Sequence, residues 1–293
     1  MTRRELIIGA VAGAAWAAPA ASRLSVEGYI FQQFAQRAKK PLGEVLGEVI
    51  PMAKAAGFHN VELNQAFFTP ELRARATELL QANGLRMPSV YVGGVMHEAG
   101  GAAKTTELAL EMAEICRPFG CTAVVNNPSP KAGGAEKTEA ELALQGELLN
   151  RLGASLKAKG FELRIHNHTP EMVSNAREFR STLRTTDPAA VAICLDLDWV
   201  HQGGMDPYAL LREAGARVTE VHVRNSKDKL WLESFSEGDV DYRRIAAQMK
   251  QQKLQPLIVV ELAWRDNTAV TRSLVENLTL GREYATKVFG VAA

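Results

Sequence analysis

Short runs of β-branched and other apolar residues recur along the chain, and they alternate with longer stretches in which apolar positions follow the 3.6-residue period of a helix. Eight such runs predict strands, at 26–31, 60–64, 87–93, 122–127, 162–168, 191–199, 218–225 and 257–264. Strands that alternate with helices form a parallel sheet, because each helix carries the chain back to the start of the next strand. Eight is also the number of strands in a (β/α)8 barrel.

Four of the predicted helices are followed at once by a glycine, which commonly ends a helix in the left-handed conformation. They lie at 43–56, 70–83, 104–119 and 137–159, before Gly57, Gly84, Gly120 and Gly160, and a fifth helix is predicted at 241–253. The competing fold is a doubly wound open sheet, but the sequence has no glycine-rich phosphate loop after its first strand. We therefore predict a single-domain α/β protein, a (β/α)8 TIM barrel over residues 22–293.

The first 21 residues have a different pattern. Arg3 and Arg4 precede an uncharged stretch of small and apolar residues that ends in Ala18-Pro19-Ala20, an A-x-A cleavage pattern. This is typical of a twin-arginine signal peptide, and the apolar part, 6–18, is shorter than the roughly 20 residues that span a bilayer. The alternatives are a buried first helix and a membrane anchor. We expect residues 1–21 to direct export to the periplasm and the processed protein to have no stable membrane span.

Composition and charge change this picture little. The chain is 46% hydrophobic and 23% charged with a net charge of +1, as in ordinary globular proteins, and no basic field points to nucleic acid. Its three cysteines, Cys116, Cys121 and Cys194, form no C-x-x-C pair and are odd in number, so neither a zinc knuckle nor a disulfide framework is indicated. We interpret them as small buried residues, with a Cys116–Cys121 disulfide left open.

Along a barrel strand, side chains alternate between the interior and the helix layer, and active-site groups lie where the strands end. In each of the last four predicted strands, this alternation directs one late polar group into the barrel mouth. These groups are His166, Asp196, His222 and Glu261. Deeper in the barrel, Arg164 is expected to pair with Glu162 or Glu220, because buried charges need partners.

A divalent cation neutralises several buried carboxylates at once, so these four groups predict a metal site. Two imidazoles with two carboxylates suit manganese, zinc, iron or cobalt, and magnesium less well. Taken singly, each group has a structural alternative, such as a hydrogen-bonded histidine at a strand end or an aspartate that caps a turn. Their coincidence in strand phase favours the metal site.

The segment "HNHTPEM", residues 166–172, adds candidates for proton transfer. His168 lies one pleat beyond His166, and an imidazole titrates near neutral pH, so His168 is the first candidate for a general base. Glu171 either orients His168, acts as the base itself or joins the metal ligands. Beside a metal that chelates a carbonyl and a neighbouring hydroxyl group, such a base removes a carbon-bound proton and gives an enediolate.

These segments together resemble the xylose isomerase-like TIM-barrel superfamily, which contains sugar phosphate isomerases and epimerases, ketose 3-epimerases, inosose dehydratases and endonuclease IV. The resemblance covers essentially the whole mature chain, through "GFHNVELN", "HNHTPEM", "CLDLDWVHQGG", "EVHVRN" and "VVELAW". Its most specific parts are "HNHTPEM", similar to the HNHxxE motif of one branch, and "LDLDWVHQGG", similar to that branch's D-x-x-W-x-x-x-G-G segment.

The resemblance implies a divalent metal on the four late-strand groups, with two departures from the family pattern. His166 stands where ketose 3-epimerases have a glutamate, and that glutamate and the one on strand eight, here Glu261, are their acid-base pair. The resemblance thus implies a catalytic role for Glu261 but puts a two-glutamate mechanism in doubt. Trp199 stands where many members have a histidine, and it either forms an apolar wall for the substrate or packs beneath a loop.

The candidates for substrate contact are Glu62, His97, Trp199 and Arg224. For Arg224 the alternative is an inward salt bridge to Glu220 or Asp198. For Glu62 and His97 the alternative is a loop or surface role. The expected partner is a small carbohydrate rather than nucleic acid, and the family resemblance leaves a homodimer open.

We therefore expect a divalent-metal-dependent sugar isomerase or epimerase. A lyase or dehydratase acting on keto-sugars or keto-glycosides is the alternative, because loss of a β-hydroxyl or an aglycone starts from the same enediolate. A non-catalytic sugar-binding barrel is the alternative from another class. An endonuclease IV-like enzyme fits less well, since it needs a basic groove and more than the six histidines present.

Overall fold

The computed structural model describes residues 22–292, and eight parallel strands form its central sheet in the order β2-β1-β10-β7-β6-β5-β4-β3. These strands are β1 (Leu24–Glu27), β2 (Val61–Glu62), β3 (Ser89–Gly94), β4 (Ala123–Pro128), β5 (Glu162–Ile165), β6 (Val191–Asp196), β7 (Val218–Val223) and β10 (Leu257–Val260). Between the two outer strands of that order, β2 and β3, parallel bridges join Asn60 to Arg86 and Asn64 to Tyr91. The sheet is therefore a nearly closed barrel, and the prediction of eight parallel strands is confirmed.

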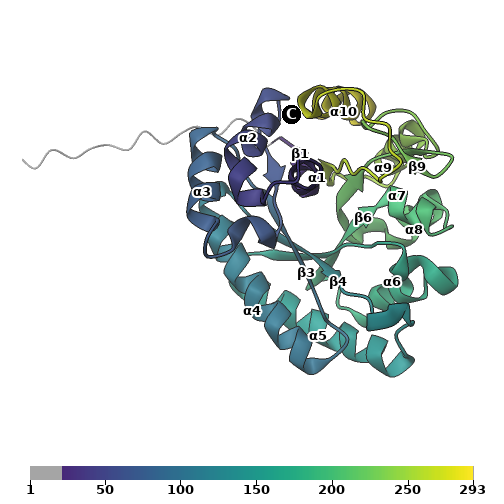
Figure 1. Cartoon of the computed structure of the whole chain (residues 1–293). Helices are drawn as coiled ribbons and strands as arrows, with labels where there is room; N and C mark the ends of the chain where they lie inside the picture. The colour runs from purple at the N-terminus through teal and green to yellow at the C-terminus, as the bar shows by residue number, and fades with distance from the viewer. Residues whose placement is uncertain (1–21, 293) are drawn as a thin grey trace, which may run out of the picture.

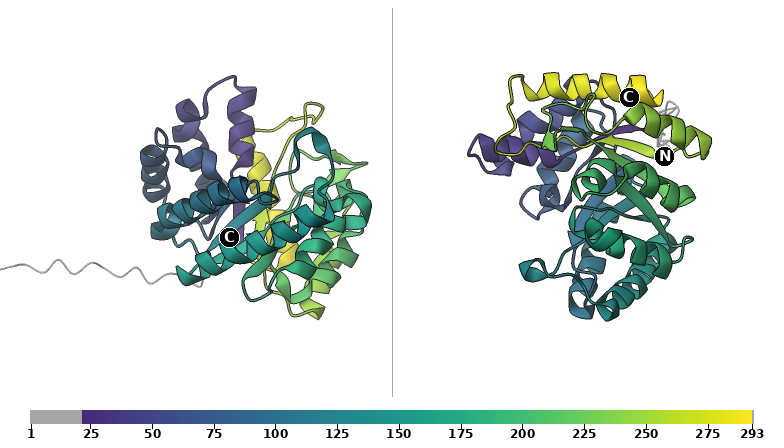
Figure 2. Two further views of the ribbon diagram at one scale, coloured as in Figure 1. Left: turned by 90° about the horizontal axis from the view of Figure 1, so that it is seen from below. Right: turned by 90° about the vertical axis from the view of Figure 1, so that its right-hand side faces the viewer.

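Helices surround this sheet, and Figure 1 shows them following one another around the barrel until the last, α10, lies beside α2. They are α1 (Tyr29–Arg37), α2 (Leu42–Ala55), α3 (Arg73–Ala82), α4 (Ala99–Cys116), α5 (Glu139–Ala158), α6 (Val173–Thr185), α7 (Leu197–Gln202), α8 (Pro207–Ala214), α9 (Tyr242–Gln251) and α10 (Leu274–Phe289). A small antiparallel hairpin, β8 (Ser226–Lys227) with β9 (Leu230–Trp231), follows β7. The two views of Figure 2 show the strands enclosed by these helices.

The glycines predicted to end helices do so. Gly57, Gly84, Gly120 and Gly160 all have positive φ, between 61° and 87°, directly before the turns that lead into β2, β3, β4 and β5. After α9, the equivalent left-handed position is taken by Lys253, with φ of 58°. A side chain with a Cβ atom is strained in this conformation, so this turn is less favourable than the other four.

Most of the predicted strands are shorter than expected, and within two of the predicted runs an α-helix begins. The run at 26–31 leaves the sheet at Gly28, and α1 begins at Tyr29. The run at 191–199 ends at Asp196, whose side chain accepts a hydrogen bond from the backbone N–H of Trp199 at 2.7 Å. That bond caps α7, so Trp199 lies on a helix rather than on β6.

The chain turns with a left-handed backbone directly after the "HNHTPEM" segment. Ser174, Asn175 and Ala176 have φ values of 50°, 62° and 54°. Three consecutive residues with a Cβ atom are strained there, by about 1 to 2 kcal/mol each. Arg180 Nη1 donates to the carbonyl of Asn175 at 2.6 Å, and Ser174 Oγ donates to Glu136 at 2.7 Å. Tertiary contacts therefore hold the turn that presents this segment to the barrel mouth.

The core is continuous between the barrel strands and the inner faces of the helices, with Val26, Leu163 and Val221 among its fully buried members. Ser22 Oγ donates to the carbonyl of Ala292, so both ends of the described chain lie side by side. The expected signal peptide, 1–21, lies outside the described residues. Within residues 22–292, no helix has the length and apolar character needed to cross a membrane.

Candidate active site

Four strands bring the predicted metal ligands together at their carboxyl ends. His166 directly follows β5, Asp196 ends β6, His222 lies near the end of β7, and Glu261 directly follows β10. All four side chains are buried. One nitrogen or carboxylate oxygen from each lies within 4.8 Å of the corresponding atoms of the other three.

The distances from His166 to the two carboxylates suit a shared cation better than direct hydrogen bonds. His166 Nε2 lies 3.8 Å from Asp196 Oδ2 and 3.8 Å from Glu261 Oε2, too far for a hydrogen bond, and it has no hydrogen-bond partner among the described residues. His222 Nδ1 lies 2.6 Å from the same Glu261 oxygen. Two ligand atoms bound to one ion at about 2.1 Å lie roughly 3.0 to 3.4 Å apart, so small adjustments suffice.

The electrostatics of the cluster show a surplus of negative charge. Burial lowers the pKa of His166, yet its pKa is raised overall because the ring faces the carboxylates of Asp196 and Glu261. A buried, unpartnered imidazole nitrogen among carboxylates is the arrangement that a divalent ion satisfies. The residues present therefore fit a divalent cation, with the donor set of two nitrogens and two oxygens that the sequence predicts.

Two other groups of potential ligands share His222 but fit a cation less well. The first adds Cys194 to His166 and His222. Burial raises the pKa of the Cys194 thiol well above its ordinary value, so this group is not a thiolate. The second consists of Glu62, Glu220 and His222, deep in the barrel, where Arg164 Nη1 already pairs with Glu220.

Glu62, a candidate for substrate contact, lies beneath the cluster beside His222. Its side chain is fully buried, accepts a hydrogen bond from Ser89 Oγ and lies with Oε1 3.0 Å from His222 Nε2. Glu62 thus contacts Nε2 of His222, whereas Nδ1 of the same ring faces Glu261. Burial and then the neighbouring Glu220 carboxylate raise the pKa of Glu62 to about 7.

The expected pairing of Arg164 is present. Its Nε lies 2.6 Å from Glu162, and its Nη1 pairs with the fully buried Glu220. Glu220 Oε1 lies 3.4 Å from His222 Nε2. A chain of charged groups therefore runs through the barrel interior from the lower end to the candidate site.

Some side chains of the "HNHTPEM" segment face the candidate site, and others form hydrogen bonds that fix the backbone. Asn167 exchanges two hydrogen bonds with the backbone of Asp196, both 3.1 Å, and so joins β5 to β6. His168 Nδ1 lies 3.0 Å from Asn127 Oδ1, while Asn127 Nδ2 donates to the carbonyl of His166 and to Glu171. Because the Asn127 NH₂ group already donates, the Asn127 oxygen accepts a hydrogen bond from the N–H at His168 Nδ1, which leaves the lone pair on His168 Nε2.

Burial, followed by the neighbouring His166, lowers the pKa of His168 well below its ordinary value, so this imidazole is neutral at neutral pH. Glu171 is buried, and it accepts the backbone N–H of His168 at 2.7 Å. Of the three roles considered for Glu171, this contact supports orientation of His168. Glu171 is not among the groups of convergent metal-binding atoms in the described chain.

Arg224 directly follows β7, and its guanidinium lies among the carboxylates of the cluster. Nη2 is 2.9 Å from Asp196 Oδ2, Nη1 is 2.8 Å from Glu261 Oε1, and Nε is 3.7 Å from Asp198 Oδ2. The guanidinium carbon also lies 4.7 Å from the ring centre of Trp199 and 4.4 Å from that of Trp231. The alternative of a salt bridge to Asp198 thus describes part of this arrangement, and Glu220 is not a partner of Arg224.

Trp199 lies with its ring edge-on to His168, 5.1 Å between ring centres, and it also packs against Trp231 of the β8–β9 hairpin at 5.0 Å. His97 lies in the loop between β3 and α4, and none of the side-chain hydrogen bonds among residues 22–292 involves it. The structure therefore brings Trp199 and Arg224 to the candidate site, and no hydrogen bond or ion pair among residues 22–292 joins His97 to the four clustered groups.

Three residues at the site were not singled out from the sequence: Glu27, Asn127 and Trp231. Glu27 ends β1 and is buried, and burial followed by the charges of Glu261 and Glu62 raises its pKa well above the usual range. The sequence signal for Glu27 is the one that identifies Glu261, a single carboxylate at the end of an apolar strand. Trp231 belongs to the β8–β9 hairpin, and its Nε1 donates to Asp198 Oδ2 at 2.8 Å. No pattern in the sequence predicts this hairpin.

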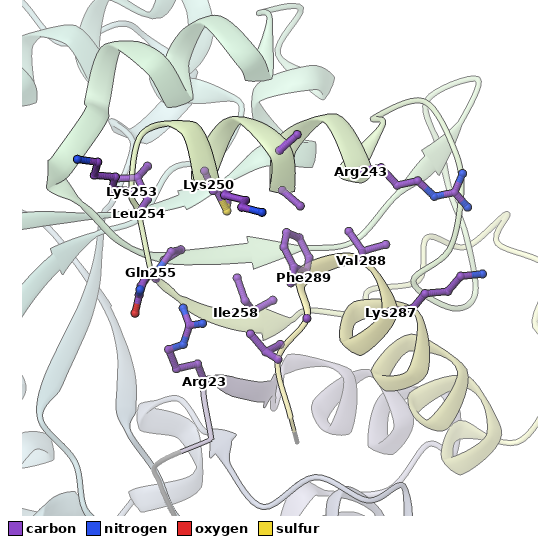
Figure 3. A pocket seen from close by; sticks show the side chains of 16 residues that line it. Arg23, Arg243, Lys250, Lys253, Leu254, Gln255, Ile258, Lys287, Val288 and Phe289 are labelled. Atoms are coloured by element: carbon purple, nitrogen blue, oxygen red, sulfur yellow. The ribbon is translucent and has the colours of Figure 1, made fainter.

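A cavity of about 780 Å³ lies at the opposite end of the barrel, between α9, α10 and the start of β10 (Figure 3). Ile258 and Phe289 contribute apolar lining, and Lys250 and Lys287 add charge. Both lysines lie in the last turns of helices, where they offset the negative partial charge of the helix end. In this fold catalytic groups gather at the other end, so we do not assign this cavity to the active site.

Comparison with known proteins agrees with this architecture. The model of the family named xylose isomerase-like TIM barrel matches residues 50–281. An inosose dehydratase from Geobacillus kaustophilus (strain HTA426) is 24% identical over 216 residues, which make up 68% of this chain and 67% of that protein.

Two solved structures share the fold at low sequence identity. A sugar phosphate isomerase/epimerase from Parabacteroides distasonis has a TM-score of 0.69 and 18% identity, and covers 93% of this chain and 96% of its own. A D-allulose 3-epimerase from Methylomonas sp. has a TM-score of 0.72 and 14% identity, over 90% and 96% of the two chains. Because the family model spans most of the described barrel, the chain belongs to the xylose isomerase-like TIM barrel family.

Proposed function

We propose that this protein is a divalent-metal-dependent enzyme that removes a carbon-bound proton next to the carbonyl group of a carbohydrate. One observation carries the proposal: the lone pair of His168 Nε2 is left free by the Asn127 hydrogen bond, in a segment that also supplies a ligand of the candidate metal cluster. A neutral imidazole held in one tautomer beside a cation site is suited to general-base catalysis.

In this proposal His166, Asp196, His222 and Glu261 hold the cation, which when bound polarises the carbonyl group of the substrate. Other residues of the chain bind the substrate and orient the base. Trp199 offers an apolar face to a sugar ring, and Glu171 fixes the backbone of His168 by accepting its N–H. Glu261 serves as a ligand rather than as a base, because Arg224 and then the two histidines hold its pKa well below the usual range although burial opposes this.

We favour elimination of water as the outcome. An imidazole can take the proton from carbon and return it to the departing β-hydroxyl group, so that a carbon–carbon double bond forms, water leaves and no proton is left over. Epimerisation needs a second acid-base group on the opposite face of the substrate, and His166 occupies the strand-five position at which ketose 3-epimerases carry that glutamate. The sequence relative described above is a dehydratase, which also supports this choice.

Isomerisation is the second candidate, because a single base can also move a proton between neighbouring carbons. Epimerisation is also a candidate, because D-allulose 3-epimerase shares the fold. It requires that a group not assigned above returns a proton to the opposite face of the substrate. The same substrates serve for all three outcomes.

The decisive experiment follows proton transfer in D₂O. The chain from residue 22 is purified with its native metal, its metal content is measured, and it is incubated with aldoses, ketoses, 3-keto-glycosides and inososes under NMR observation. An unsaturated product identifies the dehydratase, and carbon-bound deuterium in an isomer identifies the isomerase or epimerase. His168→Gln should abolish either signal, whereas His59→Gln, at an exposed position before β2, should not.

Two results would contradict the proposal. The first is exchange that persists in the His168→Gln protein, which would remove His168 as the base. The second is a protein that contains no metal and turns over none of these compounds, which would favour a non-catalytic sugar-binding barrel.

A further inference from the structure

Arg224 and the candidate metal ligands use the same atoms. Asp196 Oδ2, the oxygen that faces His166 Nε2, accepts a hydrogen bond from Arg224 Nη2 at 2.9 Å. The second Asp196 oxygen is also in use, because it caps α7 through the backbone N–H of Trp199. Both oxygens of the carboxylate that ends β6 are therefore hydrogen-bonded, and the oxygen that faces His166 already holds the positively charged Arg224 guanidinium, which would repel a cation at the same oxygen.

Glu261 divides its oxygens in the same way. Oε1 accepts from Arg224 Nη1 at 2.8 Å, and Oε2 lies against His222 Nδ1 and 3.8 Å from His166 Nε2. One guanidinium thus connects two of the four candidate ligands, and its own side chain is only 3% exposed. A buried cation in this position supplies the positive charge that both carboxylates require.

We propose that Arg224 is an internal cation that occupies the site in the metal-free protein, and that it must withdraw from Asp196 before a divalent ion can bind there. This inference rests on the metal site of the proposed function and adds a competitor to it. The competitor lowers the affinity for metal below the value that the four ligands alone would give.

The structure also contains a place for the withdrawn guanidinium. Arg224 Nε has no hydrogen-bond partner among residues 22–292 and lies 3.7 Å from Asp198 Oδ2. Asp198 is fully buried and held by Ser226 Oγ and Trp231 Nε1, both at 2.8 Å. The rings of Trp199 and Trp231 lie against the guanidinium, and cation–π contact with them persists during a small shift toward Asp198.

Charge counting indicates what the loaded site accepts. The carboxylates of Asp196, Asp198 and Glu261 contribute three negative charges, Arg224 contributes one positive charge, and a divalent ion contributes two. The loaded cluster is therefore neutral, and Arg224 has hydrogen-bond donors released from Asp196. Hydroxyl or carbonyl oxygens of a bound sugar can accept from these donors.

The test measures Mn²⁺ binding to chelator-treated protein by isothermal titration calorimetry, with no substrate present. Arg224→Met should bind Mn²⁺ at least 10-fold more tightly than the wild type. Arg224→Lys keeps the charge but cannot bridge both carboxylates, so it should also bind more tightly, whereas a purely long-range charge effect would leave its affinity at the wild-type value. Asp198→Asn removes the receiving carboxylate and should weaken binding several-fold.

Arg265→Met is the matched control, because Arg265 stacks on Trp231 at 4.5 Å without contacting Asp196 or Glu261, and its affinity should equal that of the wild type. Equal or weaker Mn²⁺ binding by Arg224→Met overturns the inference, as does an absence of binding in every variant. Should Arg224→Met fail to fold, Arg224→Lys and Asp198→Asn decide the question by the same criteria. Tighter Mn²⁺ binding by Arg224→Met, together with a wild-type protein that exchanges no carbon-bound proton in any of the sugars, would refute the proposed function alone.

Discussion

Asn127 connects the two parts of the site that come from the "HNHTPEM" segment, since its oxygen accepts from His168 and its amide donates to Glu171. We predict that Asn127→Ala lowers kcat by about 100-fold, because the imidazole loses its fixed tautomer and orientation. Metal affinity should not change, as Asn127 is not a ligand. Asn127→Asp keeps the acceptor and should retain more activity, so an unchanged kcat in Asn127→Ala would refute the positioning role.

Glu62 predicts a dependence of stability on pH. Its pKa rises from 4.5 in the unfolded chain to about 7 in the folded protein, so between these values the unfolded chain loses a proton that the folded protein keeps. The free energy of unfolding therefore falls as pH rises through this range, by at most about 3 kcal/mol. Glu62→Gln cannot ionise and should become more stable relative to the wild type as pH rises from 5 to 8.

Urea unfolding of chelator-treated protein at several pH values measures this difference. Glu48→Gln, an exposed position on α2, is the control substitution. A stability difference between wild type and Glu62→Gln that stays constant from pH 5 to 8 would contradict the prediction.

At the scale of secondary structure elements, the turn after α9 has Lys253 at the left-handed position that glycine takes in four other helix-to-strand turns. Lys253→Gly should raise the free energy of unfolding by about 1 kcal/mol, because glycine adopts a φ of 58° without Cβ strain. Gly160→Ala is the converse control. Its added Cβ would meet no atom within 4 Å, so any loss of stability there measures the backbone strain. Urea unfolding of both variants checks the pair.

The positions of the strands could be predicted from the sequence, whereas some of their ends could not. Apolar alternation locates 191–199 correctly, but it continues past the point where the Asp196 side chain caps α7. A single hydrogen bond decides that boundary, and periodicity does not detect it. The left-handed turn at Ser174–Ala176 was equally invisible, because contacts from Glu136 and Arg180 hold it against local preference.

At the scale of the whole molecule, closure of the barrel explains why the candidate ligands could be found. Once eight parallel strands close, residues that share a phase and a height must meet, as His166, Asp196, His222 and Glu261 do. Glu62 shares this phase but lies lower, and the sequence gives no measure of that depth. Asn127 lies in β4 and Trp231 in the β8–β9 hairpin, and both act through hydrogen bonds to side chains far along the chain, which periodicity does not detect.

The export of the whole molecule remains a proposal that depends on Arg3 and Arg4. Replacing both by lysine should keep the unprocessed chain in the cytoplasm of a host with an active twin-arginine pathway. Cell fractionation and mass measurement check this outcome, with the chain from residue 22 as the control that lacks the signal. Periplasmic, processed protein from the double variant would refute this route.

The three tryptophans of the described chain, Trp199, Trp231 and Trp264, all belong to segments at the carboxyl end of the barrel. Two of them lie against the Arg224 guanidinium, and the third donates from Nε1 to the carbonyl of Glu233. Tryptophan emission responds to nearby charge and solvent. The tryptophan fluorescence of residues 22–292 therefore reports on the mouth of the barrel, so the molecule carries an optical probe of ion and sugar binding that needs no label.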